Sequence, residues 1–207
     1  NMQKILMEED ANLIRQNLQG TIGECMEYAI ANNIFMEVIA LAQSDYPQGM
    51  FVPCLDFIIE LASHIQSMPI IHNDKMHKSL LQVNKLILSY IKNDMLDIND
   101  PDSLNEQVRT ILDFMKMLTH LSLDRNAEIA KFFIEEASQY ARSRGTQTYV
   151  PLQILLEFLK KEQIHQSSVY RQLLRNLILD TLKIKNDKVK RFLVIESDFA
   201  LNVVFKF

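Results

Sequence analysis

The chain has 207 residues, of which 48% are hydrophobic, so it is long enough to bury a core and is not a disordered polymer. Four glycines and five prolines are few turn residues for an all-β protein of this length, and the chain has no tryptophan, a residue that favours strands. The formal net charge of −4 argues against general nucleic-acid binding, because the summed field of the molecule would repel a phosphate backbone.

Apolar residues recur with a period near 3.6 along most of the chain, which predicts amphipathic helices. The first clear example runs from Phe51 to Ile65. The same pattern predicts helices over residues 80–91, 104–118, 129–140, 152–159 and 169–178. A last helix is expected to begin near Val189. It continues through Phe192, Ile195, Phe199 and Val203, whose spacing favours a helix over a strand.

Prolines and glycines fall where these patterns begin or break, which divides the chain into helical units with short connections. We therefore predict an all-α fold in which antiparallel helix pairs stack as an armadillo-like or HEAT-like α-solenoid, although a helix bundle fits the same helix lengths. We expect residues 1–207 to form a single helical repeat domain. Because the chain starts at Asn1 and stops on VVFKF, we also expect it to be a fragment of a longer protein.

The known catalytic and cofactor-binding motifs are missing from the sequence. It has no P-loop, no dinucleotide-binding glycine motif, no GxSxG elbow and no HExxH. We therefore expect no enzyme activity, no catalytic residue, no cofactor and no metal.

The two cysteines and the acidic pairs have unremarkable explanations. Cys25 and Cys54 are 29 residues apart and outside any CxxC pair, so we expect reduced core thiols and not a zinc site or a disulfide. The acids Glu8–Asp10, and Glu135 with Glu136, are expected on solvated faces of helices.

The histidines cluster in one short segment, where His64, His72 and His77 fall within fourteen residues. With Asp74 they offer imidazole and carboxylate groups to a metal. Pro69, however, predicts a turn in this segment, and we favour a solvated junction between helices.

Five cations lie within nine residues near the C-terminal end of this acidic chain: Lys183, Lys185, Lys188, Lys190 and Arg191. Such a patch can bind an acidic partner or a lipid headgroup, or can be the ordinary end of one helix and start of the next. We take it as a candidate partner-binding site. We also expect the chain to dimerise through the apolar C-terminal helix beyond it.

The stretch from Cys25 begins with CMEY, continues as a helix, and reaches the turn DYPQGM before a helix that contains Phe57 and Ile65. Pro69 and His77 follow. This order resembles the FTS-and-Hook-interacting protein family, the Hook-interacting subunit of the FHF complex, and QLLRNLILDTLKIKNDKVKRFLVI looks like a later part of the same pattern. The resemblance implies an α-solenoid that links a Hook-type dynein adaptor to endosomal membranes through a small GTPase.

We therefore expect a non-enzymatic interaction scaffold, cytoplasmic and endosome-associated, whose partners are a Hook-like coiled coil or a small GTPase. No apolar run reaches the roughly 18 residues of a membrane span, so only peripheral membrane association is expected. One rival is a helical ligand-sensing regulator, but residues 2–22 offer a DNA-binding motif only Lys4 and Arg15. The other is a helical-bundle enzyme or metalloprotein, which would need Glu-x-x-His pairs on facing helices.

Overall fold

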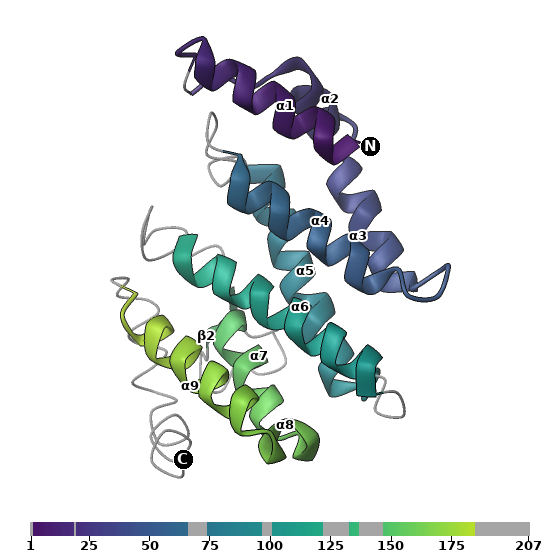
Figure 1. Ribbon diagram of the computed structural model, residues 1–207, viewed down its shortest axis with the longest axis vertical. Helices are drawn as coiled ribbons and strands as arrows, with labels where there is room; N and C mark the ends of the chain where they lie inside the picture. Colours follow the sequence, from purple (N-terminus) through teal and green to yellow (C-terminus); the bar gives the residue numbers. More distant parts are fainter. Residues whose placement is uncertain are drawn as a thin grey trace. The chain divides into compact units, whose positions relative to one another are not determined.

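The computed structural model describes residues 2–18, 20–65, 74–96, 101–121, 133–136 and 147–184, and these are predominantly helical (Figure 1). The helices are α1 (Met2–Arg15), α2 (Glu24–Ala31), α3 (Ile34–Ser44), α4 (Phe51–His64), α5 (Asp74–Lys92), α6 (Pro101–His120), α7 (Val150–Leu159), α8 (Glu162–Gln166) and α9 (Ser168–Leu182). Two strands of three residues each, β1 (Ile134–Glu136) and β2 (Gln147–Tyr149), complete the described elements. The helices predicted around residues 51–65, 80–91, 104–118, 152–159 and 169–178 are confirmed as α4, α5, α6, α7 and α9.

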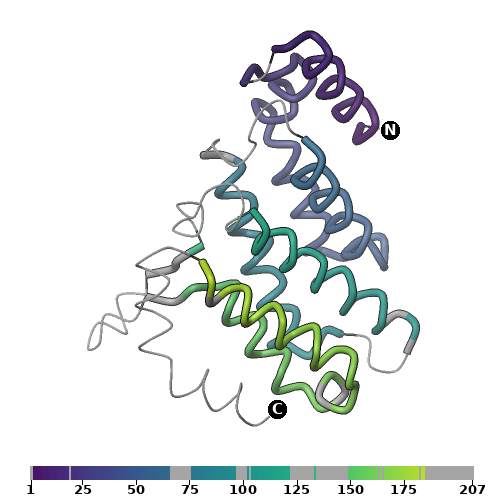
Figure 2. The backbone as a smooth tube through the Cα atoms, turned by 60° about the vertical axis from the view of Figure 1, so that its left-hand side comes forward, coloured from purple at the N-terminus to yellow at the C-terminus, as the bar shows by residue number. Residues whose placement is uncertain are grey.

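The chain forms two compact units. The first comprises Asn1–Val83 and Asp97–Met117, and therefore holds α1 to α4, the start of α5 and most of α6. The second comprises Asn84–Leu96 and Leu118–Phe207, which include the end of α5, both strands and α7 to α9. In the first unit, α3 and α4 pack side by side, as Figure 2 shows.

An apolar cluster joins the helices of the first unit. Its buried members come from α1, α2, α3, the end of α4 and α5, and they are Leu6, Met26, Ala29, Ile30, Phe35, Leu61, Ile65 and Met76. Each fully buried aliphatic or aromatic side chain of this size contributes roughly 1.5–3 kcal/mol to the free energy of unfolding. Helices as short as α2 and α3 are marginal on their own in water, so this burial is what keeps them folded.

A carboxylate from α1 caps the start of α2. Glu9 Oε1 accepts a hydrogen bond from the backbone N–H of Cys25 at 2.8 Å, and Oε2 accepts one from Met26 at 3.0 Å. The N-cap residue Gly23 has no side chain to make these bonds itself. The negative charge of Glu9 also lies at the positive end of the helix dipole. Glu9 therefore fixes α1 against α2.

Gly23 is the residue that leaves room for this carboxylate. A Cβ atom added at Gly23 would lie 2.0 Å from Cδ and 2.3 Å from Oε2 of Glu9, well inside van der Waals contact. The backbone of Gly23, at φ −73° and ψ 157°, is one that any residue adopts. The glycine is therefore required by the close approach of Glu9 and not by its own backbone conformation.

The turn between α3 and α4 uses a carboxylate in the same way. Asp45 ends α3 in the left-handed conformation, with φ 47°, and its Oδ1 accepts a hydrogen bond from the N–H of Phe51 at 2.9 Å. This bond satisfies one of the free N–H groups in the first turn of α4. Pro53, also in that first turn, loses no helical hydrogen bond, as the proline pattern predicted.

In the second unit, α7 is the central element. Eight of its ten residues are buried, and it contacts β2, α8 and α9. A helix that is apolar on all sides is expected to lie inside a core. The hydroxyl Oγ of Ser167 accepts from the N–H of Tyr170 at 3.4 Å and so caps the start of α9.

The helix predicted over residues 129–140 is wrong where the structure describes it. Ile134, Glu135 and Glu136 form β1, which pairs antiparallel with β2 so that Ile134 lies opposite Tyr149. The partner strand QTY contains Thr148 and Tyr149, residue types that favour strands, and Tyr149 is buried. Pairing with a distant segment has overridden the local helical spacing, which the sequence pattern could not show. The expectation that Glu135 and Glu136 lie on a helix is corrected with it.

Replacing Glu9 with alanine (Glu9→Ala) is expected to lower the free energy of unfolding by about 1 kcal/mol, because the N-terminus of α2 loses its cap. Glu8→Ala is the matched control. Glu8 is the neighbouring residue on α1, and its exposed ion pair with Lys4, at 3.8 Å, is worth only a few tenths of a kcal/mol. Urea unfolding followed by circular dichroism measures both variants. Equal losses at the two positions would show that the Glu9 bonds add nothing to stability.

Gly23→Ala is expected to destabilise the protein by a similar amount, about 1 kcal/mol, because the new methyl group displaces the Glu9 carboxylate. In a Glu9→Ala background the same change should be neutral, or stabilising by up to about 1 kcal/mol, because alanine restricts the unfolded chain more than glycine does. The double-mutant cycle measures this coupling. Equal effects of Gly23→Ala in both backgrounds would contradict the assigned role.

Candidate protein-interaction surface

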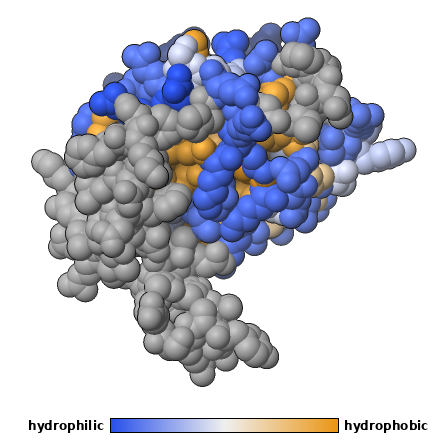
Figure 3. All heavy atoms as spheres, turned by 90° about the horizontal axis from the view of Figure 1, so that it is seen from below, coloured by the Kyte–Doolittle hydropathy of each residue, from blue (hydrophilic) through white to orange (hydrophobic). Residues whose placement is uncertain are grey.

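Large apolar side chains are exposed on α2, on α3 and in the turn that follows. Tyr28 is 64% exposed, Met36 38%, Leu41 42% and Tyr46 78%. On the face of the molecule in Figure 3, the described residues are mostly hydrophilic, with hydrophobic ones visible between them. Isolated exposed apolar residues are normal, but several on two consecutive short helices mark a candidate contact area.

The two helices present these side chains because they bury their opposite sides. Helix α2 buries Met26, Ala29 and Ile30, whereas α3 buries Phe35, Ile39 and Ala42. Residues three and four apart share a face of a helix, so the sides that carry Tyr28 and Leu41 point away from the core. We call the exposed residues Glu24, Glu27, Tyr28, Met36, Glu37 and Leu41 the α2–α3 surface.

The charge of this region has one sign only. No lysine or arginine occurs from Gln16 to Asp74, although this stretch holds seven acids: Glu24, Glu27, Glu37, Asp45, Asp56, Glu60 and Asp74. The rest of the chain carries a small excess of cations, since the whole has a net charge of only −4. The α2–α3 surface therefore combines exposed apolar groups with uncompensated negative charge.

A second acidic face lies on α4 and α6 of the same unit. Desolvation raises the pKa of the Asp56 carboxyl, and the negative charges of Glu106, Glu60 and Asp113 raise it further, while a hydrogen bond with Thr110 opposes them. Like charges thus gather here at some electrostatic cost. Arg109 relieves part of it, because its Nε lies 3.9 Å from Oδ2 of Asp113.

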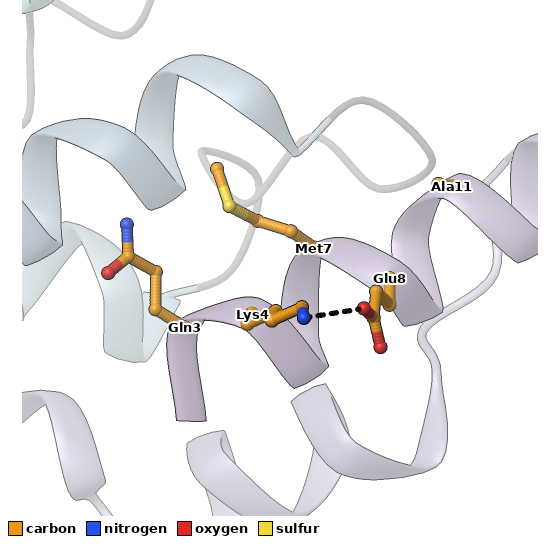
Figure 4. Close-up of a pocket in the computed structure, with 5 residues that line it drawn as sticks. All are labelled: Gln3, Lys4, Met7, Glu8 and Ala11. Carbon is orange, nitrogen blue, oxygen red and sulfur yellow. Dashed lines mark ion pairs between the residues drawn. The ribbon is translucent and has the colours of Figure 1, made fainter. Parts of the chain in front are cut away.

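Helix α1 borders an open surface pocket of about 390 Å³, lined by Gln3, Lys4, Met7, Glu8 and Ala11 (Figure 4). All five residues belong to one helix, and Lys4 and Glu8 lie next to each other along it as an ion pair. A reaction site needs polar groups that converge from several elements. These lining residues do not converge in that way, so they form a helix face.

The predicted basic site is only partly described. Lys183 lies at the C-terminal cap of α9, is exposed, and pairs through Nζ with Oδ1 of Asp180 at 2.5 Å. Lys185, Lys188, Lys190 and Arg191 lie outside the described residues, as does the predicted C-terminal helix. The partner-binding role of this cluster and the dimerisation through that helix stay predictions.

The cysteines are both free thiols, but only Cys54 is buried. The prediction that Cys25 is a core thiol is wrong, because this residue lies in the first turn of α2 on the exposed side. Desolvation raises the pKa of the Cys25 thiol, and the carboxylates of Glu9 and Glu24 raise it further. Burial also raises the pKa of Cys54. Neither thiol is activated as a nucleophile.

Other polar predictions are corrected by burial. His77 is buried within α5, so it is not part of a solvated junction, whereas His72 lies outside the described residues. In the acidic run on α1, Glu9 caps α2 and Asp10 is buried, so only Glu8 matches the expected solvated face. Of these residues, Glu9 is held by groups distant in the sequence, the backbone N–H groups of Cys25 and Met26.

No group of three or more metal-ligating side chains occurs among the residues that the structure describes. One Glu-x-x-His spacing, Glu162 to His165, is present in α8. A di-metal helical bundle uses two such motifs together with further glutamates, so one spacing alone does not indicate a metal site.

In the described part of the chain, no helix by itself has the length and apolar character needed to cross a membrane. Helices α2 and α3 pass that test only when taken together, and their axes are bent by 56°.

The α2–α3 surface was missed in the sequence, although half of its signal was visible there. The absence of lysine and arginine over residues 16–74 can be read directly from the chain. The sequence does not show which apolar residues stay exposed, because Met36 and Leu41 look like ordinary core residues of an apolar helix.

Alkylation of Cys25 by iodoacetamide at neutral pH is expected to be slow for an exposed thiol, because the raised pKa leaves little thiolate. Glu24→Gln removes one nearby negative charge without touching the Glu9 cap, so it should lower the pKa and speed the reaction. Glu60→Gln, on α4, should leave the rate unchanged. Mass spectrometry over a pH series measures the rates, with buried Cys54 as internal reference. A Cys25 pKa below that of a free cysteine would contradict the assignment.

Comparison with known proteins gives one family. Residues 25–204 match the model of the RAI16-like family, described as retinoic acid induced 16-like protein. No curated protein and no solved structure matches the chain. The match corrects the assignment to the FTS-and-Hook-interacting protein family, and the expected Hook-like coiled coil, small GTPase and endosomal location lose the support that they drew from it. Because the match spans most of its length, the chain belongs to the RAI16-like family.

Proposed function

We propose that this protein is a helical interaction module that binds another protein through the α2–α3 surface. The observation that carries the proposal is the exposure of Tyr28, Met36 and Leu41 on α2 and α3. These two helices contain glutamates but no lysine or arginine. Exposed apolar groups bordered by charge are typical of protein contact areas. Tyrosine is common at energetically important contacts, and methionine adapts to the shape of a partner.

The proposed mechanism is presentation of a rigid surface. The apolar cluster and the Glu9 cap hold α2 in place, so a partner meets side chains whose positions are set before binding. Binding then costs little conformational entropy beyond that of the side chains themselves. We further propose that the helices stack in antiparallel pairs as a solenoid, which would expose successive helix faces in the same manner.

A photo-cross-linking amino acid placed at Leu41, in the full chain expressed in its own cells, tests this function. We expect a discrete protein adduct that is lost when Tyr28→Ser and Met36→Ser remove the neighbouring apolar side chains. Leu173 is the matched control, because this leucine of α9 is 45% exposed against 42% for Leu41 but lies in the other unit. Circular dichroism checks that each variant stays helical. Identical adducts from both positions, or none from Leu41, would contradict the proposal.

A further inference from the structure

We infer that the partner segment recognised by the α2–α3 surface is a basic amphipathic helix. This inference rests on the proposed function and adds the chemistry of the partner. Each of the two helices repeats one arrangement, with a glutamate four residues before an exposed apolar side chain. The pairs are Glu24 with Tyr28 and Glu37 with Leu41.

Residues four apart are neighbours on a helix surface. On an ordinary solvated helix, a glutamate is commonly followed at this distance by a lysine or arginine, which compensates its charge. Here an apolar side chain takes that position in both helices. Among the described residues, no ion pair is formed by Glu24, Glu27 or Glu37. In the free protein these exposed glutamates are compensated by water and salt ions, so they remain available to cations of a partner.

The negative charge of the α2–α3 surface favours one class of partner over others. Anionic lipid surfaces and nucleic acids carry negative charge and are repelled by a surface that has three glutamates and no cation. A basic protein segment is attracted by the same charges, and its lysines or arginines would meet the glutamates at the rim. Charge complementarity thus points to a cationic polypeptide.

The exposed apolar side chains of the α2–α3 surface favour a helical conformation of the partner segment. An amphipathic helix presents large aliphatic side chains at every third and fourth position, with cations beside them. The apolar and cationic side chains of such a partner helix recur every three to four residues. Glu37 and Leu41, four residues apart on α3, have the same spacing and could meet one cation and one apolar side chain of the partner. Addition of a strand would need an unpaired sheet edge, and the described part of the first unit contains only helices.

Glu24, Glu27 and Glu37 also lie in the first turns of α2 and α3, where acids favour the helix dipole. A role confined to helix stability predicts that neutralising them lowers thermal stability but leaves binding unchanged. The two roles are therefore separated by measuring binding and unfolding on the same variants.

The probe is a fluorescent amphipathic peptide of leucine and lysine, compared with one in which every lysine is glutamate. We expect the lysine peptide to bind the full chain, more weakly as salt rises, and the glutamate peptide not to bind. The triple variant Glu24→Gln, Glu27→Gln, Glu37→Gln should weaken binding by about tenfold or more. Equal binding of the two peptides would overturn the inference.

The matched control is the triple variant Glu60→Gln, Glu106→Gln, Glu162→Gln, which removes the same charge from exposed positions on α4, α6 and α8. It should change the affinity by less than about twofold. Equal weakening by both triple variants would show general attraction to an acidic protein and overturn the inference. Binding to zwitterionic phosphatidylcholine vesicles would also overturn the inference if the double variant Tyr28→Ser, Leu41→Ser abolished it. That result would assign the surface to a membrane.

The outcome is distinguishable from failure of the proposed function. If the adduct at Leu41 forms but is unaffected by the glutamine triple variant, the interaction surface stands and the basic partner is wrong. If no adduct forms at Leu41 in cells, the proposed function itself fails, whatever the peptides do.

Discussion

The structure of the first unit depends on how α1 is seated against α2. The Glu9 carboxylate accepts two backbone hydrogen bonds at the start of α2 while Leu6, on the same helix, enters the apolar cluster. A shift of α1 by one residue would turn each of these side chains by about 100° and lose both contacts at once. Gly23 allows the approach, because any side chain there would occupy the space of the carboxylate. One polar and one apolar constraint therefore select the same register.

This seating has a consequence for the exposed side of the unit. Helices α2 and α3 have only 8 and 11 residues and would not persist alone. Their inward residues must be buried against the rest of the unit, which leaves Tyr28, Met36 and Leu41 on the outside. The position of the proposed contact surface is thus a product of core packing, although none of its residues belongs to the core.

The exposed apolar residues of α9 lack the same electrostatic setting. Val169 and Leu173 on α9 are also exposed, but Arg171 and Arg175 are interspersed with them along the helix. On α2 and α3 every charged neighbour is an acid. Since rim charges govern the rate and selectivity of association, the two surfaces would attract different partners even with equal apolar area.

The sequence by itself determined the helical class, the places of α4 to α7 and α9, and the use of prolines at helix starts, because these follow from local periodicity and backbone sterics. It also contained the cation-free stretch. Only the tertiary structure decided that Ile134 enters a strand, that His77 is buried, that Cys25 is exposed, and that Glu9 caps a helix sixteen residues away. The strand pairing of Ile134 and the cap made by Glu9 depend on partners distant in the chain, and the burial of His77 and exposure of Cys25 depend on what each helix face meets. A periodic pattern records only which residues share a face, not what that face meets.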